Sequence, residues 1–350
     1  MKDEKNKRVV VAMSGGVDSS VAAALLKKEG SEVSGVFLRL NGFSAKAEAR
    51  ARRVAEILKI PFNVFNFEKE FKKRVVDCFL KGYKEGITPN PCVICNKQIK
   101  FGLLLEKALK LGADYIATGH YVRLKNGKLY RGIDKNKDQS YFLWQLGQAQ
   151  LKRILFPVGD MTKPEVRKLA KKFKLPVLGT PESMEICFVP GKLKDFLKKH
   201  LKPKPGPILN IEGKEIGWHH GLPFYTIGQR KGIELSGGPY YAVGKNEKKN
   251  ALIAASILKD SALWSKSLVA KNVNWISGKQ PKLPLKVLAQ IRYHHPAVLA
   301  VITKLPALTR RGRQTTNYKI QFTQPQRAIT PGQSVVFYKG KEIVGGGIIC

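Results

Sequence analysis

The first third of the chain alternates continuous apolar runs with segments of helical periodicity. The apolar runs cover residues 8–13, 33–40, 62–67 and 114–118. The segments with an apolar face at helical spacing are 17–28, 45–59 and 100–111. Apolar strands that alternate with helices are typical of a parallel sheet covered on both faces. We therefore expect an α/β fold that begins with a doubly wound parallel sheet.

The pattern changes after residue 119. Asn126-Gly127 lies between the runs YVRLK and KLYRGI and predicts a hairpin turn. Residues 163–201 read as helical with an interruption at 181–190, and the prolines of 203–207 (PKPGP) mark a boundary. Short, turn-rich strands follow to the end of the chain. We predict a catalytic domain at 1–204, a small central β domain at 205–272 and a C-terminal β-barrel at 273–350.

The composition indicates where the protein is located and what kind of partner it binds. The chain has 350 residues, is 43% hydrophobic, and its N-terminal MKDEKNKR passes directly into an apolar strand. We find no room there for a signal peptide and no membrane span, so we expect a cytoplasmic protein. Lys and Arg number 63 against 26 acidic residues, a formal charge of +37. This excess favours a polyanionic partner, although a generally basic proteome is an alternative explanation.

A loop between the first strand and the first helix has the composition of a phosphate site. Residues 13–20 read MSGGVDSS. Adjacent glycines allow a sharp turn that exposes amide groups, and the helix that follows directs its positive end to the same place. The lysine of a Walker A loop is absent. The pattern SGGxDS instead resembles the pyrophosphate loop (PP-loop) of enzymes that split ATP into AMP and pyrophosphate.

Five cysteines are too few and too scattered for a disulfide framework. Cys95 precedes a helix that we expect to begin near Gln98, and Lys97 and Lys100 are close in sequence. This placement predicts a lowered pKa for the Cys95 thiol. Cys78 is expected to be a small buried hydrophobe within its helix, and we assign no function to Cys350.

Several further motifs resemble one family along the whole chain. They are TPNPCVICNKQIKFG, ATGHYVR, KDQSYFLWQL, MEICFVP, GLPFYTIGQRKGI, PQRAITPGQSVVFY and GGGII, in addition to the SGGVDSS loop. Their order is similar to that of the bacterial tRNA 2-thiouridylases of the PP-loop superfamily. The resemblance implies an N-terminal domain of the adenine nucleotide alpha hydrolase type and an ATP-dependent sulfurtransferase. Such an enzyme adenylates the C2 oxygen of the tRNA wobble uridine and replaces it with sulfur.

The resemblance also implies roles for single residues. Cys187 would receive sulfur as a persulfide, Cys95 would be the catalytic nucleophile, and the two would end the cycle as a disulfide that a reductant reopens. The persulfide either attacks C2 directly or gives up hydrosulfide. ATP with Mg²⁺ would lie against Ala12, Met13, Ser14, Gly15, Gly16, Val17, Asp18, Ser19, Leu38 and Gly119. The tRNA would contact Asn90, Pro91, Cys92, His120, Lys137, Asp138, Gln139, Arg292, Tyr293 and Gln333.

The implied partners are tRNA and either a persulfide relay protein or a cysteine desulfurase, and we expect a monomer. Two departures from the family pattern leave alternatives open. Cys92 stands where an Asp is usual, which creates a Cys92-x-x-Cys95 pair. Together with Cys187, this pair could hold a 4Fe-4S cluster. We favour the persulfide route over this alternative. Arg50 occupies a position where we expect an acidic residue, in a segment (40–50) shorter than usual.

Two other functions compete with thiolation. Another PP-loop ATP pyrophosphatase acting on a small molecule would share the loop but would not need Cys95, Cys187 or so basic a surface. A basic RNA-binding module without activity would need neither the intact loop nor the cysteines.

Overall fold

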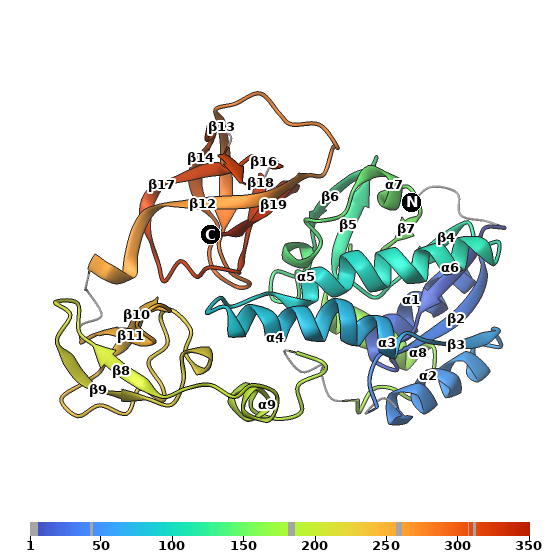
Figure 1. Ribbon diagram of the computed structural model, residues 1–350. Helices are drawn as coiled ribbons and strands as arrows, with labels where there is room; N and C mark the ends of the chain where they lie inside the picture. Colours follow the sequence, from blue (N-terminus) through green and yellow to red (C-terminus); the bar gives the residue numbers. More distant parts are fainter. Residues whose placement is uncertain (1–5, 43–44, 181–185, 257–260, 307, 311–312) are drawn as a thin grey trace.

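The computed structural model describes residues 6–42, 45–180, 186–256, 261–306, 308–310 and 313–350. Figure 1 shows an α/β domain that contains the N-terminal half of the chain, and two β structures built from the C-terminal part. None of the described helices is long and apolar enough to span a lipid bilayer. The expected fold class, with its order of α/β domain, small β domain and β-barrel, is confirmed. The exact domain boundaries remain predictions.

The α/β domain is built on a parallel sheet with strand order β3-β2-β1-β4-β7. Its strands are β1 (Arg8–Ala12), β2 (Glu32–Arg39), β3 (Phe62–Asn66), β4 (Tyr115–Ala117) and β7 (Ile154–Leu155). Side chains of β1 alternate between two cores, because Val9 and Val11 join one buried cluster and Val10 joins the other. Burial on both faces explains why the strand sequence is continuously apolar.

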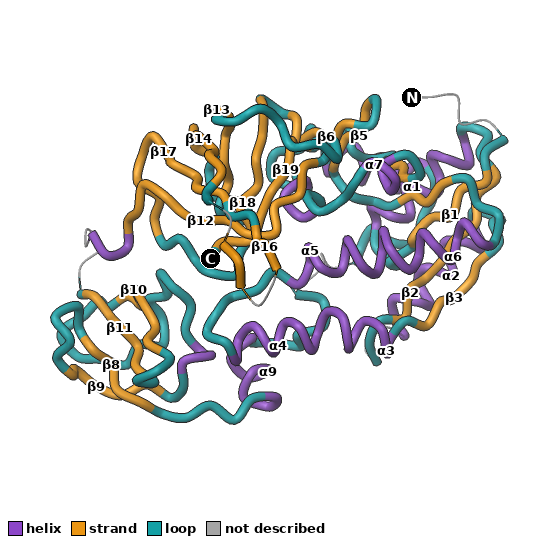
Figure 2. The backbone as a smooth tube through the Cα atoms, turned by 45° about the horizontal axis from the view of Figure 1, so that its top comes forward, coloured by secondary structure: helices purple, strands orange, loops and turns teal. Residues whose placement is uncertain are grey.

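Helices cover both faces of this sheet. The face that includes Val9 packs against α1 (Val17–Lys28), α2 (Ala45–Ile57) and α8 (Lys163–Lys172). The opposite face packs against α3 (Glu68–Phe71), α4 (Asp77–Lys84), α5 (Pro91–Cys95) and α6 (Leu105–Lys110). Figure 2 shows the segments α3–α4 and α5–α6 as two long, neighbouring helices. Wider π-helical turns at Lys72–Val76 and Asn96–Leu104 make each of these pairs continuous.

The helix that carries Cys95 starts earlier than expected. We predicted a start near Gln98, but α5 begins at Pro91 after the extended residue Asn90. Proline is well suited to a first helical position, because its missing N–H would have no partner there. Cys95 therefore lies inside a helix, at the junction between its α-helical and π-helical turns.

Two β structures follow the α/β domain. The first is a sheet of β8 (Gly206–Leu209), β9 (Glu215–His219), β10 (Tyr241–Asn246) and β11 (Ala251–Ala255), reached through α9 (Leu193–His200). The second is a barrel whose closing pair is β12–β19. Its strands are β12 (Trp264–Trp275), β13 (Leu285–Gln290), β14 (Val298–Lys304), β17 (Tyr318–Arg327), β18 (Ser334–Lys339) and β19 (Glu342–Ile349). A short pair, β15 (Leu308–Arg310) and β16 (Arg313–Thr315), is separate.

A hairpin from the α/β domain joins the barrel. Strands β5 (Val122–Lys125) and β6 (Lys128–Arg131) confirm the predicted hairpin, and both residues of the turn have positive φ. β6 then pairs with β19, with Tyr130 opposite Glu342. The Arg131 guanidinium donates to Asp138 Oδ2 and Gln290 Oε1, each at 3.0 Å. The barrel is thus attached to the α/β domain by a shared sheet and by the hydrogen bond from Arg131 to Gln290 of β13.

Candidate active site

The glycine–serine loop between β1 and α1 is held by its own hydroxyl groups. The Ser14 N–H donates to Ser19 Oγ at 3.0 Å, and the Ser20 hydroxyl donates to the Gly16 carbonyl at 2.8 Å. Gly15 has φ +74°, a conformation in which glycine is strongly favoured. The loop lies at the carboxyl end of β1, where open α/β sheets bind their ligands. These features fit a bound phosphate chain.

Two side chains that the sequence did not single out are bound to this loop. Lys163 Nζ lies 2.7 and 2.8 Å from the two Asp18 carboxylate oxygens, and the Tyr121 hydroxyl donates to Asp18 Oδ1 at 2.7 Å. Gly119 approaches so closely that a Cβ there would lie 2.6 Å from the Ser19 nitrogen. Lys163 begins α8, far away in sequence, and no local signal could have linked it to Asp18.

The unusual Arg50 also belongs to this region. Its Nε donates to the Gly15 carbonyl at 3.1 Å, so α2 is tied to the loop through this side chain. Leu38, expected to lie near adenosine, is half-buried on β2 and packs, like Ala12, against the core that contains Val10. The predicted nucleotide residues therefore gather at one edge of the sheet, and their contact with ATP remains a prediction.

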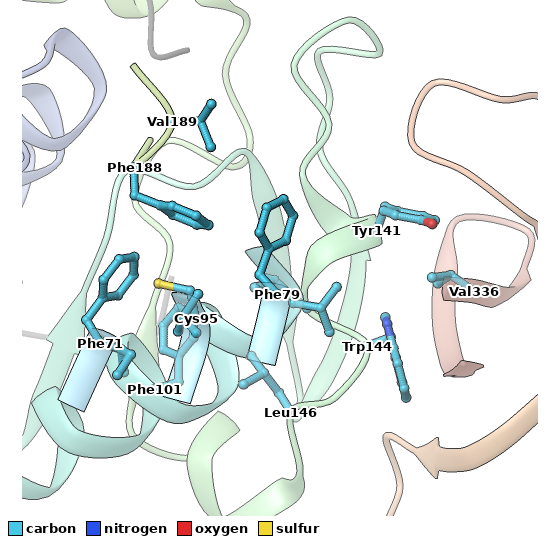
Figure 3. Close-up of a cluster of buried hydrophobic side chains, with 14 of the residues drawn as sticks. Phe71, Phe79, Cys95, Phe101, Tyr141, Trp144, Leu146, Phe188, Val189 and Val336 are labelled. Carbon is cyan, nitrogen blue, oxygen red and sulfur yellow. The ribbon is translucent and has the colours of Figure 1, made fainter. Parts of the chain in front are cut away.

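Cys95 lies among aromatic side chains on the other face of the sheet. Figure 3 shows it in the cluster that includes Phe71, Phe79 and Phe188. Only 8% of Cys95 is exposed. The Phe188 ring lies 5.6 Å from that of Phe71 and 5.3 Å from that of Phe79, so the segment following Cys187 is anchored in this cluster. The fold thereby brings the two cysteines, distant in sequence, into one site.

Burial overrides the lowered thiol pKa that we predicted. Burial raises the pKa of Cys95 to about 12 and that of Cys92 to about 11, and it also raises the pKa of the more exposed Cys187. Lys100 acts in the opposite direction on all three thiols. Negative charge on Cys187 raises the pKa of Cys95 further, which shows that these groups are near each other. Lys97 is exposed and contributes nothing to these shifts.

The π-helical turn explains why Lys100 reaches this site. Residues five apart lie on one face of a π-helix, so Lys100 follows Cys95 on the same side. Lys100 also helps burial to lower the pKa of His120 well below its ordinary value, which leaves that imidazole neutral. His120 follows Gly119, and its ring lies 5.8 Å from that of Phe101. The Lys100 charge thus acts on the three thiols and on His120 alike.

The residues do not form a metal site as they are placed. In the described part of the chain, no group of three or more His, Cys, Asp or Glu side chains has the arrangement of metal ligands. We therefore derive no step through an iron–sulfur cluster. Mg²⁺ would be held chiefly by nucleotide phosphates, as is usual for this ion.

The predicted tRNA residues fall into two groups. Cys92 lies near the barrel, because its charge affects the pKa of Tyr293, and Asn90 lines a cavity together with Gly332 and Ser334 of the barrel. The Gln333 amide donates to the Thr88 carbonyl at 2.8 Å. Burial is the main reason that the Tyr293 pKa is raised, to about 12. Arg292 is half-buried beside Tyr293, and Pro91 is buried at the start of α5.

The second group is engaged within the protein. Asp138 is 8% exposed and accepts hydrogen bonds from Arg131, Gly132 and Ser140. His120 is equally buried, and its Nδ1 lies 2.7 Å from the Thr118 hydroxyl. The Gln139 side chain accepts from a backbone amide, while Lys137 is half-buried. Their contact with tRNA stays a prediction, and the carboxylate of Asp138 has a structural role here.

Known proteins match the chain along nearly its whole length. Three family models match the chain in order, described as a tRNA methyl transferase HUP domain (residues 7–191), a tRNA methyl transferase PRC-barrel domain (194–256) and an aminomethyltransferase beta-barrel domain (265–349). The tRNA-specific 2-thiouridylase MnmA of Roseiflexus castenholzii is 44% identical over 98% of this chain and 99% of its own length. A second relative of that name, from Geobacillus kaustophilus, is 44% identical over 98% and 94%. The chain belongs to the tRNA-specific 2-thiouridylase family.

Solved structures of other proteins also match part of this 2-thiouridylase. The U34-tRNA thiolase NcsA of Methanococcus maripaludis, described with its [4Fe-4S] cluster, matches 56% of this chain and 64% of its own at 20% identity and a TM-score of 0.37. A 4-thiouridine synthetase in complex with RNA and ATP matches 52% and 45% at 20% identity and a TM-score of 0.36. These likenesses are distant, and we base no argument on them.

Proposed function

We propose that this protein transfers sulfur to C2 of the wobble uridine in tRNA at the expense of ATP, releasing AMP and pyrophosphate. The observation that carries the proposal is the proximity of Cys95, Cys187 and Lys100, whose charges act on one another. The Asn41 side chain, just after the carboxyl end of β2, also donates to the Cys187 carbonyl at 3.4 Å. An ATP pyrophosphatase acting on a small molecule needs no such pair of thiols. The formal charge of +37 fits a tRNA substrate, and the relatives bear the name of this reaction.

The proposed reaction begins with activation of the base. The uridine C2 oxygen attacks the α-phosphorus of ATP, and pyrophosphate leaves as the C2–O–AMP bond forms. The loop at residues 14–19 holds the phosphates through backbone amides and hydroxyls. Asp18 is held by Lys163, which fixes the start of α1 beneath the phosphates. A persulfide relay protein or a cysteine desulfurase would then load Cys187 in the cytosol, where tRNA is found.

Sulfur transfer can follow two balanced routes. In the first, the terminal sulfur of the Cys187 persulfide attacks C2 and expels AMP; the Cys95 thiolate then attacks the Cys187 sulfur, which releases the 2-thio base. In the second, Cys95 attacks the Cys187 sulfur first, and the hydrosulfide that leaves attacks C2 and expels AMP. Both routes form one Cys95–Cys187 disulfide, which a two-electron reductant must reopen. Each route requires a negatively charged sulfur in a buried site.

Lys100 is the residue placed to stabilise that charge. Burial disfavours the thiolate of Cys95, and among the described residues the Lys100 ammonium is the cation that opposes this effect at all three thiols. Replacing Lys100 with Met should therefore lower the single-turnover rate of thiolation by roughly 10²-fold, the size of effect typical of one lost electrostatic contact in a closed site. Loss of the cation raises the thiol pKa further, so the alkaline rise of the rate profile should move to higher pH.

Lys100→Arg and Lys97→Met are the matched controls. Arginine keeps the charge and should restore most of the rate, and Lys97 is exposed on the same helix without an effect on the thiols. An unchanged pH profile in Lys100→Met would remove Lys100 from the mechanism.

The proposed function is tested with purified enzyme, ATP, a persulfide donor and tRNA transcripts that carry a wobble uridine. We expect pyrophosphate release that depends on tRNA, and 2-thiouridine in the nucleosides analysed by mass spectrometry. A matched transcript with cytidine at the wobble position should support neither. ATP cleavage at an equal rate without tRNA, with no sulfur in the nucleosides, would indicate a pyrophosphatase that acts on a small molecule and would overturn the proposal.

A further inference from the structure

The short segment before α5 is bonded to both β structures. Thr88 donates its N–H to the Pro331 carbonyl at 2.9 Å, and the Gln333 amide donates to the Thr88 carbonyl at 2.8 Å. Pro331 and Gln333 belong to the barrel. From the central β sheet, Lys245 Nζ donates to the Gly86 carbonyl at 2.9 Å. Residues 86–88 are thus a junction of the three parts of the molecule.

The contacts at this junction are close. Gly332 has φ +89°, and a Cβ there would lie 3.0 Å from backbone atoms of Thr88. Gly82 of α4 lies against Pro89, where a Cβ would come within 2.8 Å of the ring. A cavity of about 280 Å³ nevertheless opens between α4, the strip at 89–94 and the barrel. Because packing leaves this space, hydrogen bonds supply much of the constraint on residues 86–88.

A displacement at Thr88 would be passed on to the reactive residues. Pro89 and Pro91 restrict the backbone on either side of Asn90, and α5 begins immediately with Pro91. The backbone between Thr88 and the helix that carries Cys92 and Cys95 therefore has little conformational freedom. The position of the barrel and of the central sheet sets the position of this helix.

We infer that Gln333 and Lys245 are positioning residues that place the strip Asn90–Cys92 and Cys95 for reaction once tRNA has bound to the β structures. This inference rests on the proposed function. Resemblance assigns Gln333 to tRNA contact alone, whereas here its amide holds the backbone that leads to the catalytic helix. A contact with RNA contributes to binding, and a positioning residue contributes to the step after binding.

Loss of the hydrogen bond from Gln333 to Thr88 should not detach the barrel from the α/β domain. Tyr141 donates its hydroxyl to the Ser334 carbonyl at 2.8 Å, and the Trp144 indole donates to Ser334 Oγ at 3.0 Å. Asn274 donates to the carbonyls of Trp144 and Leu146. These bonds remain in a variant at Gln333, so its effect is expected to stay local to residues 86–95.

The test uses Gln333→Glu and Lys245→Met in the full-length enzyme. Glutamate keeps the size of glutamine but removes the donor and places an acceptor against the Thr88 carbonyl. Methionine removes the ammonium that binds Gly86. The controls are Gln321→Glu on an exposed position of the barrel and Lys248→Met on an exposed position beside β10, which make the same charge changes.

The measurements are the Kd for tRNA, the kcat for thiolation at saturating tRNA, and hydrogen exchange of residues 86–95 without tRNA. We expect kcat to fall about 10- to 100-fold in both variants, with Kd near that of its control and faster exchange at 86–95. A raised Kd with unchanged kcat and exchange would make Gln333 an RNA contact only and overturn the inference. If the wild-type enzyme forms no 2-thiouridine, the proposed function is wrong. If hydrogen exchange at residues 86–95 is unchanged in the variants, the positioning role of Gln333 and Lys245 is wrong, whatever the activity.

Discussion

Replacing Cys95 with serine is expected to abolish 2-thiouridine formation while tRNA-dependent pyrophosphate release continues. Both proposed routes need the Cys95 sulfur to attack Cys187, and a serine hydroxyl is neither acidic nor nucleophilic enough to take its place. Activation of the base occurs at the loop of residues 14–19 and does not involve this sulfur. We expect the rate of thiolation to fall by roughly 10³-fold or more, as for the loss of other catalytic nucleophiles.

Cys187→Ser should give an equal loss for a different reason, because no persulfide can form on the enzyme. Mass spectrometry of the intact protein after incubation with a donor distinguishes the two variants. Cys95→Ser should retain an added sulfur atom, and Cys187→Ser should not. Cys78→Ser is the control, since Cys78 is exposed on α4 and has no part in the reaction. Full thiolation by either active-site variant would disprove the two-cysteine mechanism.

The sequence predicted local features well. The strand, loop and helix at residues 8–28 are adjacent in the chain, so apolar periodicity and turn chemistry specify them without tertiary information. The hairpin at Asn126-Gly127 was predicted for the same reason. Its addition to the barrel through β19 was not, because pairing between distant strands leaves no local signal.

Predictions that depended on burial were less successful. Cys95 was expected to have a lowered pKa, but a helix that begins at Pro91 and a shell that includes Phe188 bury the thiol instead. Cys78 was expected to be buried and is exposed. Asp138, which the family resemblance assigns to tRNA contact, is buried and paired with Arg131, and its contact with tRNA remains a prediction. For Cys95 a distant segment, the one that carries Phe188, decides the environment, and sequence spacing does not encode it.

Gly15→Ala is expected to disable the ATP-dependent step. Gly15 has φ +74°, which costs a residue with a Cβ about 1–2 kcal/mol, and the new Cβ would collide with the carbonyl oxygen of Ala47. Relief requires α2 to move relative to the loop, although Arg50 ties them together at the Gly15 carbonyl. A misplacement near 1 Å is enough to lower kcat/KM for ATP by roughly 10²-fold, measured as tRNA-dependent pyrophosphate release.

This variant distinguishes the role of the loop in using ATP from the role of the thiols in carrying sulfur. Gly15→Ala should still accept sulfur on Cys187 from a donor, because that reaction takes place on the other face of the sheet without nucleotide. Gly179→Ala is the matched control, since a Cβ at Gly179 meets no atom within 4 Å, and its kcat/KM should equal that of the wild type. Thermal denaturation of both variants shows whether the domain remains folded at the assay temperature. A folded Gly15→Ala enzyme with the wild-type kcat/KM would mean that the phosphates of ATP bind elsewhere, because no accommodation of an alanine in this loop leaves its amides in place.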